Sequence, residues 1–466
     1  MRAAATLADL EAQVGRDLRL VAYPEIDWVP ERQDAFGRAV LDVLVVGAGQ
    51  GGLALSFALQ RERVSRVLAI DAAPAGAEGP WTNIARMHTL RSWKTVTGPD
   101  LDIPSLTYQS WHEAQWGAAD FDALGKIPTK NWHAYLQWYR RVLGLKVENG
   151  TRLTGIAPAG GFLAAKVDRA GTSGEILARK IVLAQGIEAS GRWWMPEFLE
   201  RLPRHLCAHT GDAIDFGRLR GRHVAVVGAG ASAFDNAATA LEAGAATVTL
   251  CCRRERLQRV QPYKQISFNG FFRHFRELDD TARWRFMNYL LTMREALPME
   301  TWDRCTRHAN FRVEEGRPWT DARTDRDVVV GITPKGELRA DFVIAGTGFD
   351  MDFAARPELS ALAPLVATWA DRYTPPAGEE NPRLSRYPYL GPDFELLEKR
   401  PGVAPWLRDI RVFTFGNTMS FGPAGSSINA MKFAVPRLAA GLTRDFFRED
   451  EAAFFAALQK YDTPEF

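Results

Sequence analysis

Several patterns that commonly indicate a class of protein are scarce or absent in this chain. Its 466 residues include only four cysteines, Cys207, Cys251, Cys252 and Cys305, and no two of them form a CxxC pair. This spacing argues against a dithiol redox centre and against a metal site. So few cysteines fit a reducing intracellular compartment, where adjacent Cys251 and Cys252 would pack at the end of a buried strand rather than react.

The chain also has no large excess of charge of one sign and no long apolar run. The formal net charge is +2, so nothing favours nucleic acid or an anionic membrane as a partner. No apolar run reaches the length of a membrane span, and the first residues do not show a basic and then apolar signal segment. We therefore expect a cytoplasmic protein of two or three domains that acts on a small molecule, with a homodimer as one possible assembly.

One glycine-rich pattern is present twice. The copies are Val43-Leu-Val-Val-Gly47-Ala-Gly49-Gln50-Gly-Gly52 and Val224-Ala-Val-Val-Gly228-Ala-Gly230-Ala-Ser232-Ala233. Each reads as a buried strand, a tight turn and the start of a helix, which is typical of a βαβ dinucleotide-binding unit. Two units predict two bound dinucleotides with electron transfer between them, and we expect the numbered turn and helix residues to hold the cofactors.

The first copy has the residue types that an FAD or NAD site needs. Gly47 makes the turn, Gly49 lets the backbone approach a pyrophosphate, and Gly52 lets the helix pack close to the strand. The N-terminus of the helix that follows the turn presents free N–H groups to the phosphates. The next strand ends at Asp71, whose carboxylate would accept a hydrogen bond from a ribose 2′-hydroxyl.

The second copy lacks this carboxylate. The position that corresponds to Asp71 is Cys252, and Arg253 and Arg254 follow it. Guanidinium groups attract and hydrogen-bond a 2′-phosphate, which a carboxylate would repel, so this site favours NADPH. The alternative is that the arginines form a solvated run of charge.

Three further motifs complete a family resemblance that extends from about residue 41 to about residue 445. Gly79-Pro-Trp81 resembles a Gly-Gly-x-Trp turn, Ala345-Gly-Thr347-Gly348-Phe349 resembles an Ala-Thr-Gly-Tyr motif, and Gly416-Asn417 stands where Gly-Asp is frequent. Together with the two glycine turns, these motifs resemble the class B flavin-dependent monooxygenases, which include the flavin-containing, Baeyer–Villiger and YUCCA-type enzymes. The resemblance implies that Trp81, Thr347, Gly348, Gly416 and Asn417 lie at the cofactors.

The resemblance also implies a fold. We expect an α/β protein with two Rossmann-like dinucleotide-binding domains, in which an NADPH domain interrupts the FAD domain. The expected divisions of this fold are the first part of the FAD domain at 41–205, the NADPH domain with a helical insertion at 206–338, and the second part of the FAD domain with C-terminal helices at 339–466. Before them we expect an N-terminal helical arm at 1–40, because Leu7, Leu10 and Val14 recur at helical spacing.

The activity that the resemblance implies is an NADPH- and O2-dependent monooxygenation through a C4a-(hydro)peroxyflavin. Heteroatom oxygenation, Baeyer–Villiger oxidation and ring hydroxylation stay open, and some relatives hydroxylate purine-like heterocycles such as urate. Two other functions remain: an NADPH-dependent flavin reductase that transfers electrons without oxygenation, and a non-catalytic nucleotide-binding protein.

The catalytic residues are the least defined part of the resemblance. Of the family marker Phe-x-Gly-x-x-x-His-x-x-x-aromatic, this chain keeps only His209. The segment Met87-His-Thr-Leu-Arg91-Ser-Trp-Lys94 is similar to the Leu-x-x-x-Lys of YUCCA-type chains, and this similarity implies that Arg91 or Lys94 faces the flavin as a catalytic residue.

Two patterns in the chain have both a functional and a structural interpretation. Gly422-Pro-Ala-Gly-Ser426-Ser427 precedes a helical pattern, and its serines could cap that helix. In the functional interpretation the start of the helix stabilises negative charge on the flavin. In the structural interpretation the segment is simply the cap of a C-terminal helix. Five tryptophans either line a flat aromatic pocket with Phe421 or belong to the core; they are Trp93, Trp111, Trp116, Trp132 and Trp138.

Overall fold

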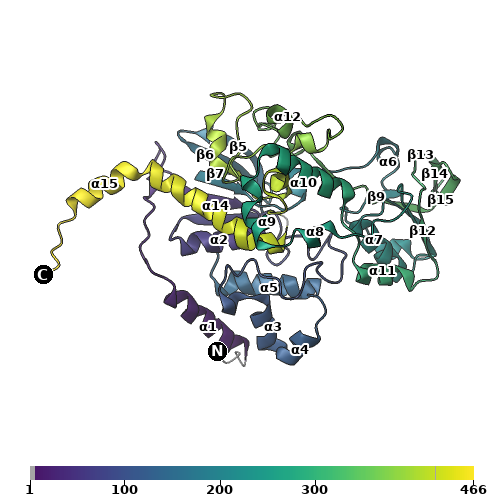
Figure 1. Ribbon diagram of the computed structural model, residues 1–466, viewed down its shortest axis with the longest axis horizontal. Coiled ribbons are helices and arrows are strands. Elements are labelled where there is room, and N and C mark those ends of the chain that lie inside the picture. The colour runs from purple at the N-terminus through teal and green to yellow at the C-terminus, as the bar shows by residue number, and fades with distance from the viewer. Residues whose placement is uncertain (1–5, 426) are drawn as a thin grey trace.

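The computed structural model describes residues 6–425 and 427–466 and contains two large β-sheets, one mixed and one parallel (Figure 1). The parallel part of the first sheet has the order β4-β3-β2-β7-β18, with β2 (Ala39–Val46), β3 (Val67–Asp71), β4 (Val147–Asn149), β7 (Thr172–Leu183) and β18 (Ile410–Val412). Strand β2 and the second half of β7 are almost continuously buried, as is typical of parallel strands that are covered on both faces.

The first sheet continues as an antiparallel meander. The start of β7 pairs with β6 (Phe162–Arg169), which pairs with β5 (Thr151–Ala159), and the short β1 (Arg32–Gln33) pairs with the start of β2. Because β7 belongs to both parts, its carboxyl end lies beside that of β2, next to the first glycine turn.

The second sheet is five-stranded and wholly parallel, in the order β12-β11-β10-β16-β9. Its strands are β9 (Cys207–His209), β10 (His223–Val227), β11 (Thr247–Cys251), β12 (Phe311–Glu314) and β16 (Phe342–Ala345). We expected the NADPH segment to end at 338, but β16 pairs with β10 and β9. The sheet therefore continues beyond the expected division, to Ala345.

Two small antiparallel sheets complete the strand arrangement. One contains β13 (Asp321–Asp325), β14 (Val328–Thr333) and β15 (Gly336–Ala340) and precedes β16. The other pairs β8 (Gly191–Trp193) with β17 (Phe349–Met351). Since β8 follows the first sheet and β17 follows the second, the two connections between the sheets are hydrogen-bonded to each other.

Helices surround both sheets. The α-helices are α1 (Leu7–Leu20), α2 (Gln50–Arg61), α3 (Tyr108–Trp116), α4 (Ala118–Ala123), α5 (Thr129–Val142), α6 (Glu197–Glu200), α7 (Ala231–Glu242), α8 (Pro262–Gln265), α9 (Asn269–His274), α10 (Asp280–Met293), α11 (Met299–Thr306), α12 (Trp369–Arg372), α13 (Thr418–Phe421), α14 (Ile428–Glu449) and α15 (Glu451–Lys460). Short 3₁₀ segments are η1 (Pro104–Leu106), η2 (Glu188–Ser190), η3 (Phe216–Leu219), η4 (Phe275–Glu277), η5 (Phe353–Ala355), η6 (Leu384–Arg386), η7 (Pro405–Asp409) and η8 (Phe415–Asn417).

These elements confirm the predicted fold class. Helix α2 joins β2 to β3, and α7 joins β10 to β11, so both glycine patterns form βαβ units. The N-terminal arm is helical, with Leu10 and Val14 of α1 buried as the periodicity predicts. No helix among the described residues is long and apolar enough to span a membrane.

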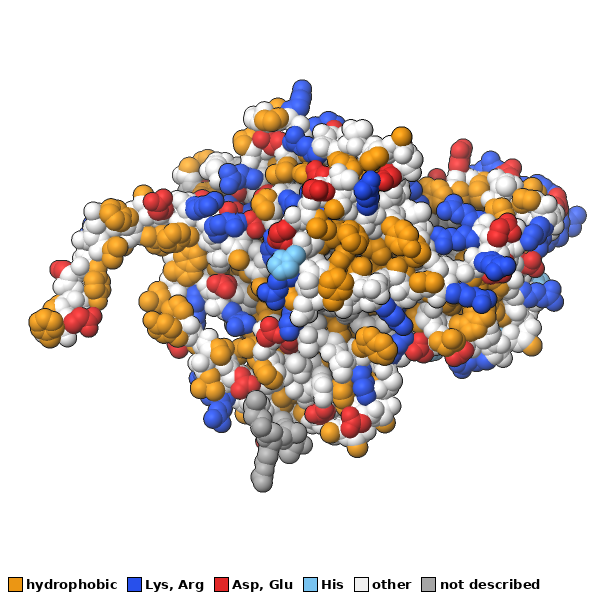
Figure 2. Space-filling view, in the orientation of Figure 1, with side chains coloured by type: hydrophobic (Ala, Val, Ile, Leu, Met, Phe, Trp, Pro, Cys, Tyr) orange, Lys and Arg blue, Asp and Glu red, His pale blue; other side chains and the backbone are white. Residues whose placement is uncertain are grey.

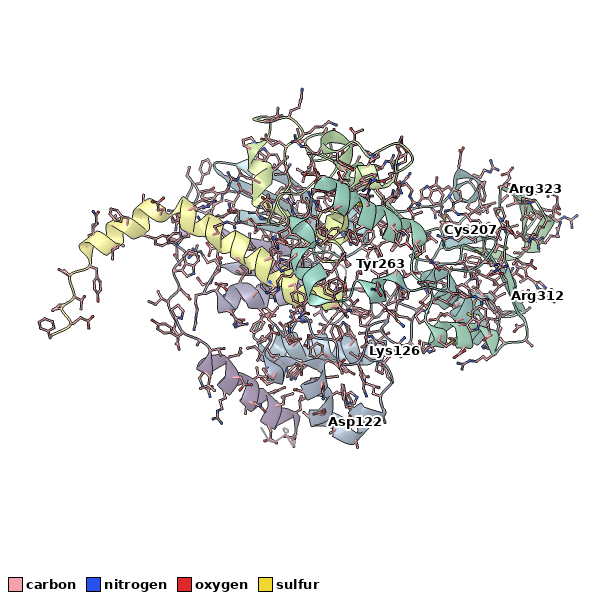
Figure 3. The ribbon with its side chains drawn as sticks, in the orientation of Figure 1. Asp122, Lys126, Cys207, Tyr263, Arg312 and Arg323 are labelled. Carbon is pink, nitrogen blue, oxygen red and sulfur yellow. The ribbon has the colours of Figure 1, made fainter. Side chains whose placement is uncertain are left out.

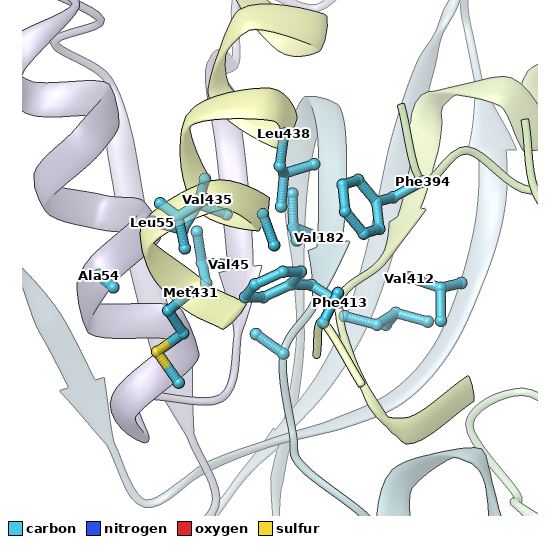
Figure 4. Close-up of a cluster of buried hydrophobic side chains, with 14 of the residues drawn as sticks. Val45, Ala54, Leu55, Val182, Phe394, Val412, Phe413, Met431, Val435 and Leu438 are labelled. Atoms are coloured by element: carbon cyan, nitrogen blue, oxygen red, sulfur yellow. The ribbon is translucent and has the colours of Figure 1, made fainter. Parts of the chain in front are cut away.

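The core of the first domain is formed where α14 packs against α2 and the sheet (Figure 4). Phe413, which follows β18, lies among Val45, Val182 and Met431 in this cluster, and all four side chains are buried. A Cβ on Gly51 of α2 would lie 3.2 Å from the Phe413 ring, so glycine at this position permits the close packing of the helix.

Charged side chains anchor the far end of α14 to β7. Lys180 is 2% exposed, and its ammonium donates to Asp409 and Glu449 at 2.6 and 2.5 Å. Neighbouring Arg179 donates to Glu449 and Asp450 at 2.7 and 2.9 Å. Buried charges require such partners, so this cluster fixes α14 against the sheet.

Most of the tryptophans considered for a substrate pocket belong to the core. Trp111, Trp132 and Trp138 are at most 3% exposed. Trp93 is 67% exposed and is the one of the five that lines the cleft described below.

Candidate functional site

A large cleft lies at the carboxyl ends of the strands of both sheets. Its volume is about 2210 Å³, whereas pockets for one small ligand have at most about 1,000 Å³. Residues that follow β2, β3 and β7 line one part, and residues that follow β10, β11 and β16 line another. Tyr263 of α8 lies between the main body and the lobe that holds Cys207 (Figure 3). The cleft is therefore large enough for two dinucleotides and a substrate.

The first glycine turn opens onto this cleft. Gly47 has φ +104°, and a Cβ there would lie 2.7 Å from the carbonyl oxygen of Ala184. A Cβ on Gly52 would overlap the carbonyl of Gly47, so this glycine lets α2 approach the strand. Gly49 faces open space, and Gly47, Gly49 and Gln50 line the cleft. The turn has the open, side-chain-free surface that a pyrophosphate requires.

Asp71, Gln50 and Trp81 surround this turn. The Asp71 carboxylate lines the cleft and accepts hydrogen bonds from the backbone N–H groups of Ala48 and Ala73, both at 2.8 Å. These bonds fix the carboxylate and leave lone pairs for a hydroxyl. Gln50 Oε1 accepts from Trp132 Nε1 at 3.2 Å. Trp81 lines the cleft, and its buried Nε1 has no partner among the described residues.

The second turn repeats the geometry of the first. Gly228 has φ +118°, and a Cβ there would overlap the carbonyl of Gly346, the residue after β16. Ala233 stands in place of the third glycine. It fits because the residue opposite is Gly346: a Cβ added to Gly346 would lie only 2.5 Å from the Cβ of Ala233. Gly230 faces open space, and Ser232 lines the cleft at the start of α7.

The two arginines after β11 have different surroundings. Arg253 is exposed, lines the cleft and makes no hydrogen bond or ion pair within the described part of the chain. The Arg254 guanidinium instead donates to the carbonyl oxygens of Thr292 and Met293 at 2.8 and 3.0 Å. Arg254 therefore holds the end of α10, and Arg253 is the free cation of the pair.

The two candidate catalytic residues, Arg91 and Lys94, also have different surroundings. Arg91 lines the cleft and pairs with Glu295 and with Asp235 of α7, at 3.6 Å for the Asp235 pair. Lys94 donates to the carbonyl oxygens of Phe121 and Asp122 at 2.7 and 2.8 Å and is not among the residues that line the cleft. The structure thus brings Arg91 to the cleft and directs Lys94 to the end of α4.

The late motifs form the junction between the domains. Thr347 donates through its hydroxyl to the Trp194 carbonyl, and Gly348, with φ +95°, lines the cleft. Gly416 packs against Ser190, and buried Asn417 accepts from the N–H of Gly425 at 3.2 Å. These last two residues support the turn before α14 rather than line the cleft.

The start of α14 opens onto the cleft through Ser427, Ile428 and Asn429. Ser426 lies outside the described residues. Ser427 is the N-cap residue, but its side chain makes no capping hydrogen bond within the described part of the chain, so the expected serine cap is corrected at this position. The first N–H groups of a helix have no intrahelical partner, and here several of the residues that carry them line the cleft.

The sequence analysis missed several residues at the cleft. Arg86 donates to the carbonyl oxygens of Thr210 and Asp212, at 2.8 and 2.6 Å, and so joins the first domain to the second. Gln185 and Asn236 line the cleft, and each carries a buried side-chain oxygen that has no partner in the described part of the chain. No local pattern marks these residues, because their role depends on contacts between distant segments.

Comparisons with known proteins agree with this geometry. Residues 44–274 match the family model described as pyridine nucleotide-disulphide oxidoreductase. The chain is 42% identical over 462 residues, 99% of its length and 97% of the relative's, to an FAD-dependent urate hydroxylase from Xanthomonas campestris pv. campestris. The chain belongs to the class B flavin-dependent monooxygenases. The predicted enzyme class, a flavoprotein monooxygenase that uses FAD, NADPH and O2, is confirmed by this membership.

Solved structures show the same fold at low sequence identity. An ornithine N-hydroxylase from Kutzneria sp. 744, in complex with reduced FAD, NADP⁺ and L-ornithine, has a TM-score of 0.67 at 18% identity and covers 87% of this chain and 99% of its own. An L-lysine 6-monooxygenase from Pseudomonas syringae has the same TM-score at 19% identity, with the same coverage.

The residues at the cleft fit both cofactors. The glycine turns offer two open cradles that Cβ atoms would obstruct or narrow, and each leads into a helix N-terminus. In the first site, buried Trp81 Nε1 has no partner among the described residues, and an unpaired buried donor is costly unless a ligand or water satisfies it. In the second site, exposed Arg253 is likewise unpaired among the described residues and is available to an anionic ligand.

His209, the remnant of the family marker, has a structural environment. Its ring is 2% exposed, stacks on Trp193 at 5.1 Å, and accepts through Nδ1 from the N–H of Gly211. Burial lowers the pKa of His209 to about 4. The imidazole is therefore neutral at neutral pH and is unsuited to proton transfer there.

This low pKa predicts an acid-sensitive contribution to stability. Between about pH 6.5 and 4 the unfolded chain binds a proton at His209 while the folded protein does not, so stability falls as pH falls through this window. We expect His209→Gln to flatten the acid limb of the stability profile, by up to about 3 kcal/mol at pH 4. Urea unfolding at several pH values measures the effect. His205→Gln, at an exposed position, is the control, and an unchanged acid limb in His209→Gln would contradict the assignment.

Proposed function

We propose that this chain hydroxylates urate or a closely related oxopurine, with NADPH and O2 as co-substrates. The observation that carries the proposal is the 42% identity to the Xanthomonas urate hydroxylase, which extends over nearly the whole of both chains. The reaction balances as urate, NADPH, a proton and O2 giving hydroxylated urate, NADP⁺ and water.

In this proposal the first turn and Asp71 hold FAD, and the second turn and Arg253 hold NADPH. Residues 41–205 and the chain after β16 then form the FAD domain, and the second sheet forms the NADPH domain. When bound, reduced FAD supplies the activation of O2, and NADPH supplies the electrons. The chain's own contribution is to position the reactants and to limit access of water to the cleft.

The start of α14 has an electrostatic role in this proposal. Its first turn lies at the cleft, and Asn417 holds the preceding turn through Gly425. A helix N-terminus carries a partial positive charge, which stabilises a nearby anion. The helix would therefore favour negative charge on the reduced flavin.

A direct assay tests the substrate. We expect purified holoenzyme to oxidise NADPH slowly alone and much faster with urate, with about one O2 and one urate consumed per NADPH when turnover is coupled. NADPH absorbance, an oxygen electrode and chromatography of urate measure the three reactants. The proposal would be contradicted if urate left the rate of NADPH oxidation unchanged. It would also be contradicted if urate raised this rate but was not consumed, with hydrogen peroxide accumulating instead.

Coenzyme preference tests Arg253. We expect Arg253→Gln to lower the preference for NADPH over NADH in kcat/KM by at least about tenfold, because a hydrogen bond to a charged group is removed. Arg256→Gln is the matched control, since Arg256 is exposed in the same segment but does not line the cleft. An unchanged ratio in Arg253→Gln would exclude this arginine from the 2′-phosphate site.

A cytoplasmic homodimer is part of the proposal. Helix α15 extends from the body of the protein and has no buried residue, and its Phe455 and Leu458 are 59% and 68% exposed (Figures 1 and 2). An isolated helix of ten residues is marginal in water, which favours a partner for its apolar side chains. We expect light scattering to give a dimer mass and Phe455→Ser with Leu458→Ser to give a monomer. A monomeric unmodified protein at assay concentrations would rule the dimer out.

A further inference from the structure

Arg294 has an unusual backbone conformation at the wall of the cleft. It is the C-cap residue of α10, with φ +65° and ψ +167°, and its side chain faces the cleft. This region of the backbone map is almost restricted to glycine, and a side chain there costs about 1–3 kcal/mol. Such strain persists only where the surrounding structure imposes it, and it is concentrated at functional sites.

Side chains on both sides impose this conformation on Arg294. Before it, Arg254 holds the carbonyl oxygens of Thr292 and Met293, and Gln258 donates to Met293 at 3.2 Å. After it, the Glu295 carboxylate pairs with Arg91. One loop of the NADPH domain, which holds Arg254 and Gln258, and one loop of the FAD domain, which holds Arg91, thus fix the residues that flank Arg294.

The guanidinium of Arg294 has no anionic partner of its own. Two charged groups act on it electrostatically: Arg383, which pairs with Asp350 at 3.5 Å, and Glu295, which pairs with Arg91. Within the described part of the chain, Arg294 makes no side-chain hydrogen bond and no ion pair. Partial desolvation lowers the pKa of Arg294. Arg294 is nevertheless an exposed residue that lines the cleft, so its guanidinium is available to donate charge-assisted hydrogen bonds to an anion there.

Two phenols stand beside this cation. Tyr263 of α8 and buried Tyr387 both interact electrostatically with Arg294 and line the cleft. Neither hydroxyl makes a hydrogen bond within the described part of the chain. Burial raises the pKa of Tyr263 to about 12 and raises that of Tyr387 as well, so both hydroxyls remain protonated donors at neutral pH.

We propose that Arg294, Tyr263 and Tyr387 form the subsite that binds the anionic edge of the substrate. Urate carries one negative charge at neutral pH, and its ring presents a flat row of oxygen and nitrogen acceptors. A planar guanidinium can bind such an edge through two N–H groups, and the two phenols supply further donors. The inference rests on the proposed oxidation of urate and adds how this chain selects that substrate.

Equilibrium binding to the oxidised holoenzyme tests the subsite. We expect Arg294→Gln to raise the Kd for urate, measured by flavin absorbance changes, by at least about tenfold. Tyr263→Phe and Tyr387→Phe should each raise it by about two- to tenfold. The Kd for NADP⁺ should remain unchanged in all three, and Arg294→Lys should retain part of the urate affinity because it keeps the charge.

Strain gives a second and independent readout. Arg294→Gly removes the Cβ that disfavours this backbone conformation, so we expect it to raise the thermal midpoint while it weakens urate binding. Arg326→Gly is the matched control, because Arg326 has φ +56° in the turn between β13 and β14, away from the cleft. It should raise the midpoint and leave the urate Kd unchanged.

The outcomes separate this inference from the proposed function. If the unmodified enzyme oxidises urate but Arg294→Gln binds urate as tightly as the unmodified enzyme does, the proposed subsite is wrong and the proposed substrate is retained. If Arg294→Gln weakens NADP⁺ and not urate, the residue belongs to the nucleotide site and the inference is overturned. If the unmodified enzyme does not oxidise urate, the proposed function fails and the subsite fails with it.

Discussion

The architecture depends on one close contact that is present in both sheets, where the backbone of a glycine meets a carbonyl group at the end of the neighbouring strand. Gly47 lies against Ala184 after β7, and Gly228 lies against Gly346 after β16. In each case a Cβ would collide with this carbonyl, so no other residue allows the two strand ends to approach so closely. The contact brings the carboxyl ends of parallel strands together, and there the crevice of a doubly wound sheet binds its ligand. The cleft, the order of the domains and the position of both cofactor cradles follow from it.

Local patterns in the sequence predicted the parts of the molecule that local chemistry determines. The glycine turns, the acid at the end of β3 and the amphipathic α1 each need only neighbours in the chain, and each lies where its pattern indicated. The division at 338 failed because strand pairing is a long-range property. The apolar run that became β16 could have belonged to either sheet, and only its register with β10 and β9 assigns it to the second.

Side-chain roles were harder to predict, since distant segments determine them. Arg253 and Arg254 are adjacent and chemically identical, yet only Arg254 reaches the end of α10. Lys94 is three residues from Arg91, but the carbonyl groups at the end of α4 bind its ammonium. The strain at Arg294 cannot be read from an arginine within a helical pattern, because it depends on the anchors that hold its neighbours.

The buried cysteines have a consequence for an enzyme that activates oxygen. Flavin-dependent oxygenation that loses its substrate releases hydrogen peroxide, which attacks thiolates rather than thiols. All four cysteines are buried and free, and burial raises the pKa of Cys207 and Cys305 to about 12. At pH 7 a thiol with this pKa is ionised in only about one molecule in 10⁵. Hydrogen peroxide that the enzyme releases should therefore react slowly with its cysteines, and turnover without substrate should leave these thiols intact.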